Sequence, residues 1–516
     1  MTTADPPTTS KRLSRLRALL HEEPGYLVHH TIKTLLAGWP HNDTSFQTAL
    51  EYTGQHFERW PANLCTPAPD EMETLRKGTP SPQWSTVRTL PVEGPQWETS
   101  NIKALLYHPD SRLTRLRVGC DLRTQRGLEW CRRLAKALPD SNLTELDVYF
   151  QRSGFSTDRG AQVANTNTLL TNGALTLANA LPNLQKLHLT QCHIHGDAAK
   201  ALTMLPLPQL TELHLPRNAM EAAGAQILAG SDLLHQLTRL DLSFNGMGAQ
   251  AIERFVHTTA TAKLQALSLS GNTFGRNGAH ALAQARHLNS LRELHLESIR
   301  PSSSIHKPWL HPIAEAPWLS GLTHLNLSNN GINDSDLRIC IEAAQSPAQL
   351  TELNLARNVL SPASAWNLVR SPWAQSLTSL DLVGNSIGEA GVRELLRASR
   401  VTLRTLDLVS TPWAGSTTAP RNDTTFARLH TLRVPWPQYN RNLVPALIEQ
   451  GPFPALRNLS LSYQATEQQL HHLITSAAFP QLAMLNVPYV HRSVSKAARK
   501  QLRHAAAQRG LIHVYI

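Results

Sequence analysis

The chain has 516 residues and a formal net charge of +11, with 41% hydrophobic and 17% charged residues. That composition excludes a disordered or highly solvated chain and leaves ample material for a buried core. The positive charge favours acidic partners, with nucleic acid as one candidate among several. The length alone suggests three or four ordinary domains, unless the chain is repetitive.

The cysteines and the first residues indicate where the protein acts. The spacing of the five cysteines matches neither a disulfide framework nor a paired zinc site; they are Cys65, Cys120, Cys131, Cys192 and Cys340. A reducing compartment is the simplest interpretation. The N-terminus lacks the apolar stretch of a secretory signal, and no apolar run reaches the length of a membrane span. We therefore expect a soluble, cytoplasmic protein.

The first 86 residues precede any repetitive pattern. We expect residues 1–10 to be disordered, and residues 11–37 and 43–60 to form helices, because their apolar residues recur at helical spacing. The first helix should be interrupted near Pro24. Terminal repeats need a cap over the open edge of their core. Residues 1–86 are accordingly predicted to be a disordered start followed by a helical N-terminal cap.

From Val87 onward a pattern of the form L-x-x-L-x-L recurs, and most successive copies start 26 to 28 residues apart. Eight clear copies start at Leu210, Leu237, Leu264, Leu291, Leu322, Leu350, Leu377 and Leu403. Degraded copies start at Val87, Leu113, Leu143, Leu184, Leu429, Leu456, Leu482 and Leu511. Sixteen copies in phase predict a solenoid over residues 87–492.

Each copy predicts a strand, a turn and a helix. Leu240 and Leu242 alternate with Asp241, which is a strand pattern with the leucines directed into the core. An asparagine follows, whose amide can both donate and accept hydrogen bonds where the chain leaves the strand. These predicted structural asparagines are Asn218, Asn245, Asn272, Asn330, Asn358 and Asn385. A segment with Ala and Leu at helical spacing comes next, as in residues 224–230.

These residues resemble the ribonuclease-inhibitor-like class of leucine-rich repeats, with the pattern LxxLxLxxNxLxxxGxxxL. Residues 377–396, LTSLDLVGNSIGEAGVRELL, fit it throughout, and the resemblance covers about residues 87–516. It implies an α/β fold: a horseshoe-shaped solenoid with a concave parallel sheet and convex helices. Members of that class are mostly binding proteins that use the concave face, so the resemblance implies the same use here.

Three segments depart from the pattern. Residues 151–173 and 300–309 lengthen two repeats with polar sequence, and residues 410–425 replace a helix by an extended loop. Such insertions either contact partners or are neutral drift. Residues 493–516 are predicted to be a C-terminal capping helix, over 495–510, followed by one last strand.

Candidate chemistry is sparse. Gly384, Ser386 and Gly388 spell GxSxG, but they fall in the phase of the repeat and not on a nucleophile elbow. His188 and His214 are expected on neighbouring strands, beside Glu212 and Asp241, where a metal or acid–base pair is conceivable. No short chelating motif supports the metal, so we interpret them as solvated surface histidines. We expect no catalytic residues, no metal, no cofactor and no enzymatic activity.

Two surface features indicate a partner site. Trp436, Tyr463 and Tyr489 each lie seven residues after a repeat start, which places the rings side by side. Trp413, Tyr439 and Tyr515 extend this aromatic row, unless the rings pack on adjoining prolines. Lys496, Arg499, Lys500 and Arg503 form a basic stripe on one face of the last predicted helix. The partner-binding site is therefore predicted to be the row and the stripe, unless the stripe is a solvated outer face.

The combined pattern predicts a monomeric scaffold or regulator that binds another protein, acidic if the stripe takes part, on its concave face. One alternative is a protein that binds nucleic acid or an acidic surface through the C-terminal helix. A second is a secreted bacterial effector acting in a host cell, which the Thr/Pro-rich first residues suggest. If the aromatic row were core, the site would lie among His214, Asp241, Glu293 and other central strand residues.

Overall fold

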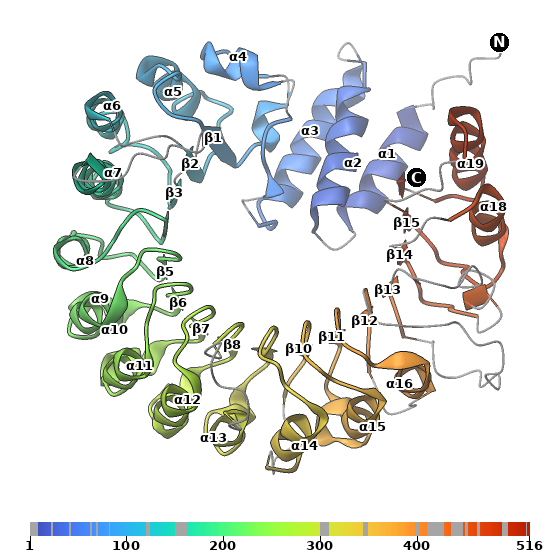
Figure 1. Cartoon of the computed structure of the whole chain (residues 1–516). Helices are drawn as coiled ribbons and strands as arrows, with labels where there is room; N and C mark the ends of the chain where they lie inside the picture. Colours follow the sequence, from blue (N-terminus) through green and yellow to red (C-terminus); the bar gives the residue numbers. More distant parts are fainter. Residues whose placement is uncertain are drawn as a thin grey trace. The chain divides into compact units, whose positions relative to one another are not determined.

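The computed structural model describes these residues: 9–21, 24–40, 43–61, 64–68, 71–81, 83–119, 124–149, 162–299, 309–343, 349–397, 402–409, 428–434, 447–448, 452–461, 465–487, 494–511 and 513–515. They fall into two compact units, Met1–Asn245 and Gly246–Ile516, which are described separately (Figure 1). The division into an N-terminal cap, a solenoid and a C-terminal cap, with boundaries after residues 86 and 492, stays a prediction.

The first unit begins with helices and continues as strand–helix repeats. Its strands are β1 (Thr89–Val92), β2 (Arg115–Gly119), β3 (Glu145–Tyr149), β4 (Lys186–Thr190), β5 (Glu212–His214) and β6 (Arg239–Asp241). Its first helical segments are α1 (Thr9–Leu20), α2 (Tyr26–Ala37), α3 (Thr44–Phe57), α4 (Met72–Arg76) and η3 (Trp84–Thr86). Between the strands lie α5 (Thr99–Leu106), α6 (Gln125–Ala135), α7 (Gln162–Asn179) and α8 (Asp197–Thr203); α9 (Glu221–Ala229) and α10 (Asp232–Gln236) follow β5.

The second unit repeats the same plan. Its strands are β7 (Ala266–Ser268), β8 (Glu293–His295), β9 (His324–Asn326), β10 (Glu352–Asn354), β11 (Ser379–Asp381), β12 (Thr405–Asp407), β13 (Thr431–Val434), β14 (Asn458–Leu461), β15 (Met484–Asn486) and β16 (His513–Tyr515). Its α-helices are α11 (Ala249–Val256), α12 (Gly275–Gln284), α13 (Leu310–Ala314), α14 (Asp334–Ala343), α15 (Pro362–Arg370), α16 (Gly388–Arg397), α18 (Glu467–Thr475) and α19 (Lys496–Gln508). Short turns of 3₁₀ helix precede four of the strands: η4 (Thr259–Lys263), η5 (Leu288–Ser290), η6 (Leu319–Gly321) and η7 (Pro372–Gln375).

Within each unit the strands pair in chain order and parallel to one another. Each of the sixteen predicted copies of the repeat contains one of the described strands, so the fold is a leucine-rich-repeat solenoid of the α/β class. In β5 and β6 the middle leucines, Leu213 and Leu240, are buried while their neighbours on the strand are partly exposed, and most other strands share this pattern. These neighbours form what we call the strand face, the side of the sheet directed away from the helices (Figure 1).

The six asparagines lie at the carboxyl ends of their strands, buried, and join one repeat to the next. The Asn218 amide nitrogen donates to the Leu189 carbonyl at 2.6 Å, and its oxygen accepts from the Cys192 backbone N–H at 2.8 Å. Asn245 does the same one repeat later, accepting from the Asn218 backbone N–H at 2.9 Å. Each amide therefore satisfies backbone groups of the preceding repeat that would otherwise be buried without partners.

Two expectations for the irregular segments need correction. Thr9 and Ser10 are helical, so residues 1–10 are not disordered throughout, although residues 1–8 lie outside the described residues. Residues 162–173 belong to α7 and are not an irregular insertion. This part is helical despite its Asn- and Thr-rich sequence because Leu170, Ala174 and Leu177 on one face are buried. Residues 150–161, 300–308 and 410–427 lie outside the described residues, so the proposed insertions there stay untested.

The described chain contains no helix with the length and hydropathy that a membrane crossing requires. Cys65, Cys131, Cys192 and Cys340 are free thiols and buried, and Cys120 lies outside the described residues.

Candidate partner-binding surface on the first unit

Ten polar side chains cover the strand face of β2 to β6. Parallel register aligns them in two rows across the sheet. One row consists of Arg115, Glu145, Lys186, Glu212 and Arg239, and the other of Arg117, Asp147, His188, His214 and Asp241. We call these ten residues the charge ladder.

The first row alternates in sign at every strand, so each of its three inner charges lies between two opposite charges. The Arg115 guanidinium is 3.8 Å from the Glu145 carboxylate, and the Lys186 ammonium is 3.8 Å from that carboxylate. Lys186 also lies 3.2 Å from Glu212. Because paired strands hold the side chains about one strand spacing apart, the pairs form without further ordering of the backbone.

The second row joins the first at both ends. Asp147 accepts a hydrogen bond from Arg115 at 2.9 Å and lies 3.4 Å from Arg117. At the other end the His214 ring is 3.8 Å from the Asp241 carboxylate and 3.9 Å from the Glu212 carboxylate. The ladder is consequently a connected network that fixes its own side chains, and not a set of isolated surface pairs.

His188 and His214 stack in the middle of the ladder, with ring centroids 4.1 Å apart and ring planes at 9°. This confirms the sequence prediction that the two rings are neighbours. They are partly buried, however, so the description as solvated surface histidines is wrong. The neighbouring strands and charged side chains shield both rings from water.

Burial disfavours protonation of both histidines, but their charged neighbours give the two rings opposite pKa shifts. Burial and the neighbouring His214 and Arg115 lower the pKa of His188 from 6.5 to about 3. Burial also opposes protonation of His214, but Asp241 and Glu212 outweigh it and raise the pKa of His214. Burial alone would raise the pKa of Glu212, yet His214 and Lys186 lower it to about 2. The neutral His188 ring thus stacks against the His214 ring, whose protonated form is stabilised by two carboxylates.

The cluster offers charged and polar groups that can recognise a ligand. In the described part of the chain no serine, threonine or cysteine side chain hydrogen-bonds to His214, so no activated nucleophile accompanies it. The described residues also contain no group of three or more His, Cys, Asp or Glu placed to hold a metal ion. The ladder instead offers donors and acceptors in fixed positions to a molecule lying across the strands.

An exposed aromatic ring adjoins the ladder at the carboxyl ends of β5 and β6. Phe244 follows Asp241 by three residues and is 38% exposed, and the Arg217 guanidinium lies 4.2 Å from its ring centroid. Both residues have left-handed backbones, with φ of 56° and 60°. A non-glycine residue in this conformation costs about 1–2 kcal/mol. We call Arg217 and Phe244 the turn anchor.

The sequence analysis missed the turn anchor, although a signal was present. Arg217 and Phe244 each precede a repeat asparagine, a position that is glycine at Gly271 and Gly384, where φ is 69°. Glycine in two copies indicates a left-handed turn in all of them. Asn329 and Arg357 hold the same position with φ of 55° and 54°, so the pairing of an exposed ring with a guanidinium, and not the backbone strain, distinguishes Arg217 and Phe244.

The residues predicted from sequence as partner-binding fall into two groups. Trp436, Tyr463 and Tyr489 lie outside the described residues, as do Trp413 and Tyr439, while Tyr515 on β16 is 54% exposed. Lys496, Lys500 and Arg503 are exposed on α19, and Arg499 is half-buried there.

The GxSxG segment has the structure of an ordinary repeat turn. Gly384 and Gly388 have φ of 69° and 61°, and the exposed Ser386 donates its backbone N–H to the Leu360 carbonyl at 2.9 Å. Asn385 is buried and donates to the Leu355 carbonyl at 2.9 Å. The Ser386 hydroxyl makes no hydrogen bond to an imidazole within the described residues.

Comparisons with known proteins agree with this architecture. A leucine-rich-repeat family model matches residues 180–202, 234–255, 262–283, 322–338 and 374–396. Pig ribonuclease inhibitor is 29% identical over 223 residues, which cover 41% of this chain and 48% of that protein. Human NACHT, LRR and PYD domains-containing protein 12 is 30% identical over 303 residues, covering 57% of this chain and 27% of that protein.

The chain therefore spans less than half the length of either relative. Among solved structures, the crystal structure of the yeast Rad7–Elc1 complex contains a chain with a TM-score of 0.43 and 14% identity. The match covers 92% of this chain and 96% of that one. The repeats, the family-model matches and the two relatives together make this chain a leucine-rich-repeat protein.

Proposed function

We propose that the chain is a non-catalytic scaffold or regulator that binds another protein through the strand face of its first unit. Proteins built from leucine-rich repeats generally mediate protein–protein interactions, and this is the coarse function that the family supports. The finer proposal concerns the place of binding, which is the charge ladder with the turn anchor at its edge.

The observation that carries the proposal is the exposed Phe244 ring under Arg217. Arginine and aromatic residues dominate the binding energy of protein interfaces, and a ring held in one orientation loses little entropy on binding. The neighbouring ladder supplies fixed polar groups that set register and exclude wrong partners. A strained, exposed anchor beside a pre-ordered polar surface is what a specific protein interface needs.

The test uses the full chain as bait in a native lysate, followed by affinity measurements on the partner that it captures. Phe244→Ala should weaken binding by about 2 kcal/mol or more, which corresponds to about thirtyfold or more in Kd. Asp241→Lys should weaken binding through charge reversal within the ladder. The matched control is Trp366→Ala, which removes another exposed aromatic ring, on α15. Equal affinities for wild type and both first-unit variants would refute the proposal.

The aromatic row of Trp436, Tyr463 and Tyr489 remains a second proposed contact of the same partner. This contact rests only on the shared position of the three residues in their repeats. The affinity of the triple alanine variant for the partner should therefore be measured beside that of Phe244→Ala. Retained affinity in the triple variant would remove the row from the proposal and leave the strand face.

The place of action is also a proposal. We propose a monomeric protein acting in the cytoplasm, with a secreted bacterial effector as the alternative that the Thr/Pro-rich first residues favour. A reporter fused to the first few dozen residues distinguishes them. Export of the fusion into a host cell supports the effector, and retention in the producing cell supports the cytoplasmic protein.

A further inference from the structure

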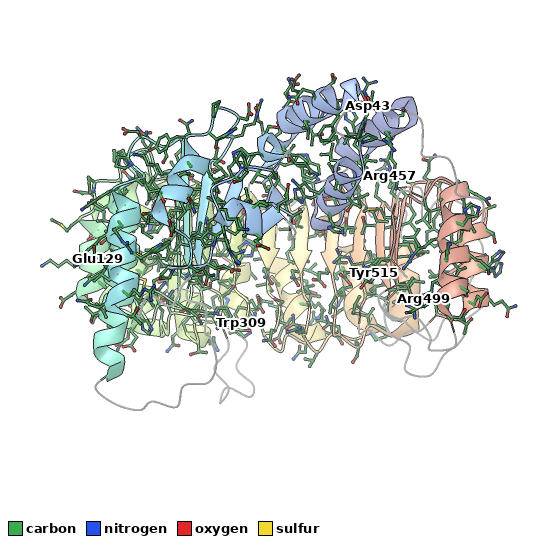
Figure 2. The ribbon with its side chains drawn as sticks, turned by 90° about the horizontal axis from the view of Figure 1, so that it is seen from above. Asp43, Glu129, Trp309, Arg457, Arg499 and Tyr515 are labelled. Atoms are coloured by element: carbon green, nitrogen blue, oxygen red, sulfur yellow. The ribbon has the colours of Figure 1, made fainter. Side chains whose placement is uncertain are left out.

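The basic stripe of Lys496, Arg499, Lys500 and Arg503 lies on a well-formed helix. The Ser495 hydroxyl caps α19 by accepting from the Ala498 backbone N–H at 3.1 Å. The helix buries Ala498, Leu502 and Ala506. The stripe lies mainly on the opposite face, and Figure 2 shows Arg499 on this helix. The spacing of apolar and basic residues thus gives α19 a packed apolar side and a charged outer side.

This arrangement is electrostatically unfavourable for the helix itself. Lys496 and Lys500 are four residues apart, as are Arg499 and Arg503, and like charges at this spacing repel. Lys496, Arg499 and Lys500 also lie within the first five residues of α19, beside the positive end of the helix dipole. No Asp or Glu occurs after Glu467 to offset either effect.

Some cations on other helices make contacts within the protein. On α6 Arg132 lies 3.7 Å from Glu129, and on α14 Arg338 donates to Glu342 at 2.8 Å. On α1 the Arg12 guanidinium lies 6.0 Å from the Trp39 ring. By contrast, in the described part of the chain no carboxylate lies within ion-pair distance of Lys496, Arg499 or Lys500. Like charges that repel one another on a helix, without a compensating ion pair inside the protein, are typical of a functional surface.

The surroundings of the stripe restrict the class of anion that it binds. The other exposed residues of α19 include Ala497, Gln501, His504 and Gln508, and no large apolar side chain is available to enter a membrane. The helix also carries no Phe, Tyr or Trp ring on which single-stranded bases could stack. The stripe spans only about 10 Å along the helix, at about 1.5 Å per residue.

The strand face of the same unit argues against a long polyanion. It carries carboxylates at Glu293, Glu352, Asp381 and Asp407; Glu352 lies 3.3 Å from the His324 ring and Asp407 lies 3.2 Å from Arg433. A short acidic segment with carboxylates one helical turn apart matches the stripe, since its charges have the spacing of Lys496 and Lys500. We infer that the basic stripe binds an acidic segment of a partner protein, at a surface separate from the strand face of the first unit.

The experiment measures binding of a fluorescent helical peptide with Glu at every fourth residue, at physiological ionic strength. The full chain should bind it, and a peptide with Gln in place of Glu should not bind. The variant Lys496→Gln/Lys500→Gln/Arg503→Gln should raise Kd at least tenfold. The matched control is Arg126→Gln/Arg132→Gln/Arg133→Gln on α6, which removes the same charge from exposed positions and should change Kd less than twofold.

Thermal unfolding separates a binding role from a structural one. Because the stripe opposes the helix dipole, the α19 variant should melt at the same temperature as wild type or higher. A lower Tm in the α19 variant would overturn the inference, since the stripe would then stabilise the fold. So would equal peptide affinity in the α19 and α6 variants.

A duplex DNA probe of equal charge tests the competing class of ligand. Tighter binding of the duplex than of the acidic peptide, lost in the α19 variant, would overturn the inference in favour of a nucleic-acid surface. Phe244→Ala should leave peptide binding unchanged, so failure of this inference is distinguishable from failure of the proposed strand-face site.

Discussion

The repeat asparagines show how one side chain can determine the same turn in six copies of the repeat. The Asn330 amide nitrogen donates to the Leu296 carbonyl at 2.7 Å, and its oxygen accepts from the Ile299 backbone N–H at 2.9 Å. Asn385 makes equivalent bonds, donating to the Leu355 carbonyl and accepting from the Leu360 backbone N–H at 3.2 Å. Loss of the amide leaves buried backbone groups without partners.

Asn385→Ala should therefore lower the free energy of unfolding by about 1–3 kcal/mol. The neighbouring Ser386→Ala should leave it unchanged, because that hydroxyl is exposed and outside the network. Urea unfolding of both variants tests these two expected changes in the free energy of unfolding. A hydrolase activity lost in Ser386→Ala alone would show that the GxSxG segment is more than a repeat turn.

The stacked histidines should give stability two opposing pH dependences. The pKa of His188 is about 3 in the folded chain and 6.5 in the unfolded chain, so the folded state loses stability as the pH falls below 6.5. His188→Gln removes this loss and should gain about 2 kcal/mol relative to wild type between pH 7 and pH 5. The measurement is the difference in urea midpoint between variant and wild type at each pH. A difference that does not change with pH would contradict the assigned burial.

The raised pKa of His214 works in the other direction. Its stabilisation is fully present below pH 6.5 and is lost as the pH rises through the folded pKa. His214→Gln should consequently cost more stability at pH 6 than at pH 8. Denaturation at those two pH values provides the check, and a larger cost at pH 8 would show that the carboxylates do not favour the charged ring.

The sequence predicted the places of individual side chains correctly where the position within the repeat determines them. The phase placed six asparagines at the strand ends and made His188 and His214 neighbours. It did not reveal the turn anchor, because the cation–π contact of Arg217 with Phe244 depends on left-handed backbones that the apolar pattern does not encode. It also gave no measure of burial, so His188 was mistaken for a solvated side chain.

At the scale of elements, the strands were predictable because their leucines recur in a fixed frame. The helices were less so: α7 has no apolar period strong enough to distinguish it from a loop, and packing of Leu170 and Leu177 decides its structure. The helix predicted over residues 495–510 was found as α19, from Lys496 to Gln508. The contact between the end of α19 and the end of α18 could not be predicted, since it is made by one arginine, Arg509.

That arginine caps the end of α18. The Arg509 guanidinium donates to the carbonyl oxygens of Leu473 at 3.3 Å, Ser476 at 2.5 Å and Phe479 at 2.9 Å, and also to that of Ile474. The last carbonyls of a helix lack intrahelical partners, and a planar fork of donors satisfies several of them at once.

Arg509→Ala should destabilise the second unit by about 2–3 kcal/mol, because charged hydrogen bonds to partly buried carbonyls are lost. Arg509→Lys should recover only part of the loss, since an ammonium cannot reproduce the fork. Thermal unfolding of both variants tests this, and full recovery by lysine would show that charge alone matters.

For the whole molecule, we propose that the N-terminal helices protect the first repeat. Arg88, just before β1, donates to the Phe57 carbonyl at 2.9 Å and the Trp60 carbonyl at 2.7 Å. The buried Lys33 lies 3.5 Å from Glu71. Helices α1 to α3 bury apolar side chains such as Leu16, Ile32 and Phe57. These contacts are typical of a cap over a solenoid edge.

Removal of residues 1–86 should expose that edge and cause aggregation, with a lower Tm for any monomer that remains. Light scattering and thermal unfolding of the 87–516 fragment measure both effects. A monomeric fragment with an unchanged Tm would show that the helices form an independent unit.

The central claim is that a partner protein lies against the strand face of the first unit. Its most direct test is photocross-linking of the captured complex, with a photoreactive phenylalanine analogue placed at Phe244 in one preparation and at Trp366 in another. The account predicts that the partner is cross-linked from position 244 and not from position 366. Cross-linking from position 366 alone would place the partner on the helices and contradict it.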